Sequence, residues 1–156
     1  MLPVDFSPAS KAALEMASDL ANHFHAELYL LNVIPMSPSP ALPDMIRETA
    51  ITEAARTYAK QHFAKCKTDL AARGIRFTSS VEIGDNIAET IMEVVDREHI
   101  DMIVISTHGL SGWRPFVFGS IAEKIIKLAQ CPLLLLHAAR PEDGVKATSR
   151  TSGEWW

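Results

Sequence analysis

The stretch IDMIVISTHGLSGWRPFVFGSIAEKIIKLAQCPLLLLH, from Ile100 to His137, decides the fold. Met102–Ile105 is a short apolar run rich in β-branched residues, which is typical of a strand buried on both faces of a parallel sheet. The apolar character stops at Ser106, and a later apolar run, Leu133–Leu136, predicts a second strand.

The segment between these two strands combines a glycine-rich loop with an amphipathic helix. The loop contains Gly109, Gly112 and Gly119, and apolar residues then recur at helical spacing over residues 121–129. In a parallel sheet such a loop follows the carboxyl end of its strand and leads to a helix N-terminus, whose unpaired amides favour an anion. The glycines by themselves also fit a turn that binds no ligand, since no Walker or dinucleotide-binding motif is present.

Strands and helices alternate along the rest of the chain. A short strand ends at Asp5, and Ser7-Pro8 then starts a helix with a capping serine and a proline in the first turn. A strand over 27–34, a proline-rich loop over 35–43, a helix over 43–73 capped by Gly74 and a strand over 77–83 follow. Gly84-Asp85 ends that strand and is expected to cap one more helix.

This alternation predicts an α/β fold with three α/β/α layers. The expected sheet is five-stranded and parallel, of order 3-2-1-4-5, as in flavodoxin-like and adenine-nucleotide alpha-hydrolase-like domains. A ligand crevice then opens between the first strand, ending at Asp5, and the fourth, ending at Ser106. One domain is expected over residues 1–138, with a disordered tail over 139–156, and the abrupt start predicts that part of the first strand is missing.

Composition and charge argue against several classes of protein. Of 156 residues, 47% are hydrophobic and 22% charged, which is an ordinary globular composition, and a net charge of -4 gives no support for nucleic-acid or membrane binding. No apolar run is long enough to span a bilayer and no cleavable signal is visible, so a cytoplasmic location is expected. Cys66 and Cys131 share no motif spacing, which predicts unpaired thiols, and the histidines show no spacing for a metal site.

The chain resembles the universal stress protein family from Pro3 to His137. The most specific mark is the family's ATP signature, Gly-x2-Gly-x9-Gly-(Ser/Thr), matched by Ser106-Thr107-His108-Gly109 and, nine residues later, Gly119-Ser120. Ser106 departs from the signature by replacing its first glycine. Supporting marks are Pro3-Val4-Asp5-Phe6-Ser7, Leu30-Leu31-Asn32-Val33, Gly84-Asp85, Ser120-Ile121-Ala122-Glu123-Lys124 and Cys131-Pro132.

The resemblance implies a site for ATP with Mg²⁺. It implies that Asp5 faces the adenosine half, that Val33 backbone groups read the adenine edge, and that Ser120 and the Ile121 amide contact the outer phosphates. The expected nucleotide-binding residues are Pro3, Val4, Asp5, Val33, Ser106, His108, Gly109, Gly112, Arg114, Gly119, Ser120 and Ile121.

Several of these residues also have a purely structural interpretation. Ser120 with Glu123 forms a Ser-x-x-Glu capping box, a role that can coexist with a phosphate contact. Asp5 can be a solvated turn acid, Arg114 a free surface arginine, and His108 a polar loop residue and not a catalytic base.

The last strand is expected to lie at an edge of the sheet, where four consecutive leucines would invite uncontrolled pairing. Association of two copies through this edge would cover it, and a two-fold dimer is the commonest closed arrangement. The resemblance implies the same contact, an antiparallel pairing of last strands. A helix or the tail over the edge is the alternative. The residues concerned are Leu133, Leu134, Leu135 and Leu136.

The expected function is that of an ATP-binding stress protein, a homodimeric nucleotide-dependent switch that acts on an unidentified protein client. No residue pair is placed like a general base and a water, and no lysine occupies a Walker position, so hydrolysis would be slow. Two alternatives stay open: a nucleotide hydrolase or transferase with His108 or Asp5 as base, and a non-binding interaction module in which Ser106 spoils the pocket. AMP or a cyclic nucleotide is a further alternative to ATP.

Overall fold

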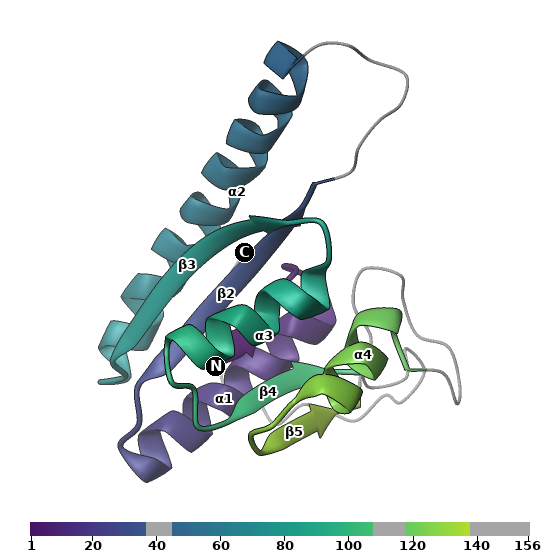
Figure 1. The fold of residues 1–156 in the computed structure, drawn as a ribbon. Helices are drawn as coiled ribbons and strands as arrows, with labels where there is room; N and C mark the ends of the chain where they lie inside the picture. The colour runs from purple at the N-terminus through teal and green to yellow at the C-terminus, as the bar shows by residue number, and fades with distance from the viewer. Residues whose placement is uncertain (37–44, 108–117, 138–156) are drawn as a thin grey trace, which may run out of the picture.

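The structure, a computed structural model, describes residues 1–36, 51–107 and 118–137, and for residues 45–50 it describes the backbone alone. The expectations for the glycine-rich loop at residues 108–117 and for the tail fall outside these residues. The elements in chain order are β1 (Leu2–Pro3), α1 (Pro8–Phe24), β2 (Leu28–Pro35), α2 (Met45–Ala72), β3 (Phe77–Gly84), α3 (Ile87–Arg97), β4 (Ile103–Ser106), α4 (Ser120–Leu128) and β5 (Leu133–Leu136) (Figure 1). This alternation is the one that the sequence predicts.

All of the described strand pairs are parallel. Leu30 of β2 lies opposite Leu2 of β1 and Ser79 of β3, and Ile103 of β4 lies opposite Leu133 of β5. The expected single sheet of order 3-2-1-4-5 is not confirmed, because the strand ladders form a three-stranded sheet, β1-β2-β3, and a two-stranded sheet, β4-β5.

The two sheets meet at the start of the chain. The Val104 N–H donates to the Met1 carbonyl at 2.9 Å, and the Met1 amine donates to the Met102 carbonyl at 2.6 Å. β1 has only two residues, and the second, Pro3, has no N–H to donate. A continuous ladder between β1 and β4 therefore does not form.

Strand residues alternate between two apolar clusters, one on each face of the sheets. Leu30 and Val104 belong to the cluster that includes side chains of α1 and α2, whereas Leu31, Ile103 and Ile105 belong to the cluster that includes side chains of α3 and α4. Figure 1 shows α3 and α4 in front of the strands and α1 behind them. Helices thus cover both faces, as the alternation of elements predicts.

One stripe of α2 packs against the rest of the protein. Its members recur at helical spacing and are all buried: Ala59, His62, Phe63, Cys66 and Leu70. The opposite face is exposed and polar, and none of the described helices is both long and apolar enough to cross a membrane.

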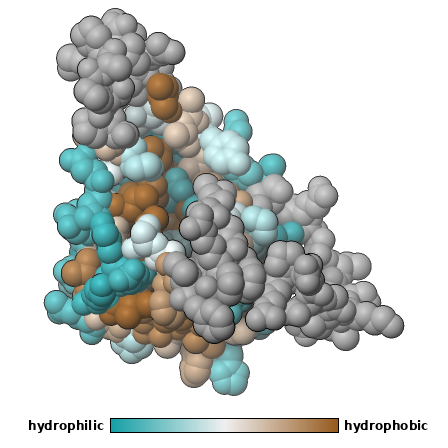
Figure 2. All heavy atoms as spheres, turned by 90° about the vertical axis from the view of Figure 1, so that its right-hand side faces the viewer, coloured by the Kyte–Doolittle hydropathy of each residue, from teal (hydrophilic) through white to brown (hydrophobic). Residues whose placement is uncertain are grey.

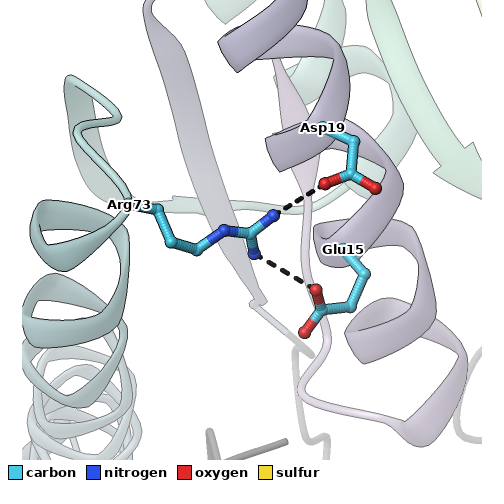
Figure 3. Close-up of polar contacts among 3 residues, drawn as sticks. All are labelled: Glu15, Asp19 and Arg73. Carbon is cyan, nitrogen blue, oxygen red and sulfur yellow. Dashed lines mark hydrogen bonds and ion pairs between the residues drawn. The ribbon is translucent and has the colours of Figure 1, made fainter. Parts of the chain in front are cut away.

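Local signals set the ends of α1 and α2 as predicted. The Ser7 side chain accepts from the Ser10 N–H at 3.2 Å, so it caps α1. Gly74 has φ 70°, a left-handed conformation that favours glycine, and its N–H donates to the Ala71 carbonyl at 3.0 Å. Arg73 then joins the end of α2 to α1 through ion pairs with Glu15 at 3.1 Å and Asp19 at 2.8 Å (Figure 3).

The predicted cap of α3 at Gly84-Asp85 is wrong. The N-cap is Asn86, whose side chain accepts from the Ala88 N–H at 3.2 Å, and Asp85 is exposed. Aspartate and asparagine cap helices about equally well, so only the backbone path decides which of two neighbours takes the role. Gly84 instead allows Thr90 to approach the end of β3 closely.

We predict that Gly84→Ala destabilises the protein by roughly 1–3 kcal/mol, because overpacking forces neighbouring groups to move. A Cβ at Gly84 would lie 2.0 Å from Thr90 Oγ1, and Thr90 is buried. Urea unfolding of Gly84→Ala, Thr90→Ala and the double variant measures the coupling. Gly84→Ala should cost much less in the Thr90→Ala background, and equal costs in the two backgrounds would disprove the close contact.

We also predict that Cys66 is inert in the native protein. Both described cysteines are unpaired, but Cys66 is fully buried, and burial raises the pKa of its thiol to about 11. Near neutral pH its thiolate fraction is then roughly a hundredfold below that of an ordinary thiol. A thiol reagent should modify the Cys66→Ser variant, which keeps half-buried Cys131, faster than the Cys131→Ser variant, with equal rates for both in urea. Fast native labelling of Cys66 would show that α2 opens readily.

Candidate functional site

A cavity of about 550 Å³ lies where β1, β2 and β4 end and α4 begins. Pockets for small ligands typically measure about 300–1,000 Å³, and parallel α/β sheets bind ligands at the carboxyl ends of their strands. Among the described residues, the ends of β1, β2 and β4, the turn after β1, and parts of α2, α3 and α4 contribute to its wall. The strand-end members are Pro3, Val4, Asp5, Asn32, Val33, Ile34, Ile105 and Ser106, and the helix members include Ala55, Tyr58, Ile87, Ile91, Ser120, Ile121 and Ala122.

Every predicted binding residue that the structure describes lines this cavity. These residues are Pro3, Val4, Asp5, Val33, Ser106, Gly119, Ser120 and Ile121. The other predicted binding residues, His108, Gly109, Gly112 and Arg114, lie outside the described residues. Sequence positions more than a hundred residues apart are thus brought to one place, and their contact with a nucleotide stays a prediction.

Asp5 is held at the cavity wall by the first turn of α1. Its Oδ1 accepts from the Ser7 N–H at 3.0 Å and from the Ser10 hydroxyl, and its own N–H donates to Ser10 Oγ at 3.2 Å. Asp5 is half-buried, and its bond from the Ser7 N–H is that of a turn acid, so the turn role and a ligand role both stay open.

Asn32 is a cavity residue that the sequence analysis does not single out as a ligand contact. Its side-chain amide donates to the Val4 carbonyl at 2.8 Å, while the Val4 N–H donates to the Leu31 carbonyl at 2.8 Å. These bonds join the ends of β1 and β2 beside Asp5. The polar residue interrupts an otherwise apolar strand, and this interruption is the signal that could have identified it.

The start of α4 differs from the predicted capping box. Gly119 is the N-cap, its carbonyl accepts from the Glu123 N–H at 2.9 Å, and no side chain completes the cap. Glu123 instead pairs with Lys127 at 2.7 Å. Ser120 is therefore the first helical residue, and its hydroxyl is not used as a cap.

Three backbone amides at the start of α4 have no partner within the helix, those of Ser120, Ile121 and Ala122, and all three residues line the cavity. The Gly119 amide differs, because it donates to the Thr107 carbonyl at 2.7 Å. The orphan amides and the helix dipole make this end of the cavity favourable for negative charge.

Ser106 and Thr107 join β4 to the site. Among described residues other than glycine, only Phe6, His25 and His99 have positive φ, so the serine that replaces the signature glycine is not in a left-handed conformation. Thr107 is buried, and its N–H donates to the Leu136 carbonyl at 2.9 Å. Its role cannot be predicted from the local sequence, because it depends on contacts with two distant segments.

The described lining residues of the cavity carry a single charge, that of Asp5, and include no lysine, arginine or histidine. An anion in the cavity would thus be held by amides and hydroxyls near α4, and would be repelled from the Asp5 end. No group of three or more His, Cys, Asp or Glu side chains within residues 1–36, 51–107 and 118–137 could hold a metal ion.

The chain matches the Universal stress protein family over residues 1–137. It is 30% identical over 142 residues to the universal stress protein MJ0531 of Methanocaldococcus jannaschii, an alignment that covers 91% of this chain and 83% of the relative.

Solved structures share the fold. Universal stress protein UspA from Lactobacillus plantarum aligns with a TM-score of 0.77 at 24% identity, covering 86% of this chain and 94% of that one. A universal stress protein in complex with cAMP aligns with a TM-score of 0.60 at 18% identity, covering 87% and 93%. The Archaeoglobus fulgidus protein in complex with dAMP aligns with a TM-score of 0.58 at 16% identity, covering 86% and 93%. The chain belongs to the universal stress protein family.

Proposed function

We propose that this protein binds ATP in the cavity and works as a nucleotide-dependent switch in a homodimer. The observation that carries the proposal is that one cavity has orphan helix amides at Ser120–Ala122 and an anchored carboxylate at Asp5. Two fold relatives are described in complex with cAMP and with dAMP, which supports an adenine nucleotide as ligand.

The residues fit a nucleotide in one orientation. The phosphates would accept hydrogen bonds from the amides of residues 120–122 and from the Ser120 hydroxyl, where the helix dipole favours negative charge. Asp5 would repel phosphates and accept hydrogen bonds from ribose hydroxyls or from the adenine amino group, and Val33 would face the adenine edge. Mg²⁺ would come with the phosphates, since it commonly binds through substrate phosphates and waters.

We predict that isothermal titration calorimetry will show ATP binding, and that Gly119→Val will weaken it at least tenfold. Gly119 lines the cavity beside the orphan amides, so a branched side chain there would occupy the space that a phosphate needs. Lys127→Val, an exposed substitution on the same helix, serves as the control and should bind ATP like the parent.

Comparison of ATP, ADP and AMP tests the phosphate assignment separately. The affinity should increase from AMP to ADP to ATP. The difference in affinity between AMP and ATP should be smaller for Gly119→Val than for the parent. A parent protein that binds no adenine nucleotide would overturn the proposed function. Equal affinity of Gly119→Val and the parent would overturn the placement of the phosphates.

The proposed dimer contact is the outer edge of β5. In the described part of the chain β5 pairs only with β4, and all four of its leucines are half-buried. Figure 2 shows apolar surface on the side of the molecule where α4 and β5 lie in Figure 1. On α4, Ile126 and Leu128 are 39% and 46% exposed. Pairing two copies would satisfy the strand edge and cover these side chains.

The dimer is tested by Leu135→Lys, because a charged residue on an edge strand disfavours pairing with another strand. Sedimentation velocity should give twice the chain mass of 17.2 kDa for the parent and a single chain for the variant. Met16→Lys, exposed on α1 in the opposite helix layer, is the control and should remain dimeric. A parent protein that sediments as a monomer at high concentration would contradict the proposal.

A further inference from the structure

An aromatic cluster that the ATP signature does not include contributes to the cavity wall. Phe6 and Tyr58 both line the cavity, Phe6 from the turn after β1 and Tyr58 from α2. Their ring centroids lie 5.7 Å apart in an edge-to-face arrangement. This contact joins two segments that are distant in the sequence, directly beside Asp5.

The cluster continues into the buried interface of α2. The His62 ring stacks on the Phe6 ring, with centroids 4.8 Å apart. The Tyr58 ring meets the His62 ring edge to face, with centroids 4.2 Å apart. Phe63 adds an edge-to-face contact with Phe6 at 5.7 Å. His62 and Phe63 are buried, so the rings that border the cavity rest on a packed base.

Tyr58 differs from the other members of the α2 stripe. The stripe of Ala59, His62, Phe63, Cys66 and Leu70 is buried, whereas Tyr58, one helical turn earlier than His62, is 54% exposed. Ala55, a further turn towards the start of the helix, also lines the cavity. The stripe thus extends from the core to the cavity. There the Tyr58 ring contacts Phe6 and His62, while more than half of its surface stays exposed.

The backbone at Phe6 adds an independent observation. Phe6 has φ 60°, a left-handed conformation that is rare for a bulky residue and that tends to occur at ligand sites. The strand-to-helix turn therefore adopts an unfavourable conformation at the residue that carries the central ring of the cluster.

We propose that Tyr58, supported by Phe6 and His62, is a specificity-determining residue that stacks on the planar base of the bound nucleotide. The inference rests on the proposed function, and it places the base against α2 while the phosphates lie at α4. Aromatic side chains stack on any base because every base has a π-face. Tyr58 therefore favours ligands that carry a planar base over ligands without one, and it does not distinguish between bases by their hydrogen-bonding groups.

The test compares Tyr58→Leu and Tyr58→Phe with Tyr29→Leu, a control at the other tyrosine of the chain, which is half-buried on β2 and does not line the cavity. Calorimetry with ATP should show binding weakened about tenfold in Tyr58→Leu and nearly unchanged in Tyr58→Phe and Tyr29→Leu. ATP binding to Tyr58→Leu as tight as to the parent would overturn the inference.

A second measurement uses the parent protein alone, so it does not depend on how well the variants fold. Nuclear Overhauser effects between the adenine ring protons of bound ATP and the Tyr58 ring are expected. Effects from the adenine protons to other residues only would overturn the inference and leave the proposed function intact. Absence of any ATP binding by the parent would overturn the proposed function itself.

Discussion

The arrangement depends on two backbone hydrogen bonds made by one buried residue, Thr107. Its N–H donates to the Leu136 carbonyl at 2.9 Å, and its carbonyl accepts from the Gly119 N–H at 2.7 Å. The first bond ties the end of β4 to the end of β5, and the second ties it to the start of α4. Because a buried backbone group without a partner is costly, these bonds fix the α4 N-terminus at the carboxyl ends of the strands. The same residue lines the cavity and is bonded to the strand that we propose as the dimer contact.

The cavity combines two regions of different chemistry, the Asp5 carboxylate and the amides at the start of α4. The strand directions bring both regions to the same edge of the sheets. Parallel strands bring Asp5, Val33 and Ser106 to one edge, and the helix after β4 begins at that edge with unpaired amides. The first turn of α1 holds the carboxylate of Asp5, and the apolar residues Ile87 and Ile91 of α3 also line the cavity. A nucleotide has the same sequence of groups, with an anionic end, a polar sugar and an apolar planar base. This match is the physical basis of the proposed function.

Local patterns predicted the elements well, because apolar periodicity and caps such as Ser7 act within a few residues. They failed where neighbours compete for one role: Asn86 caps α3 where Asp85 was expected, and Gly119 takes the position expected for Ser120. The sheet order could not be settled from the pattern, since two-residue β1 with Pro3 forms too few hydrogen bonds to make a ladder with β4. At the site, strand-end residues were predictable because parallel strands must end together. Thr107 and Tyr58 were not, since their roles arise only when distant segments pack.

The central claim is that the amides at the start of α4 receive the phosphates of a nucleotide. An amide-resolved NMR titration with ATP measures this directly, because each backbone N–H reports its own environment. The claim predicts that the signals of Ser120, Ile121 and Ala122 move together and saturate with the affinity measured for the whole protein. It also predicts that inorganic triphosphate moves the same signals. If ATP binds while these three amides keep their positions, the phosphates lie elsewhere and the claim is contradicted.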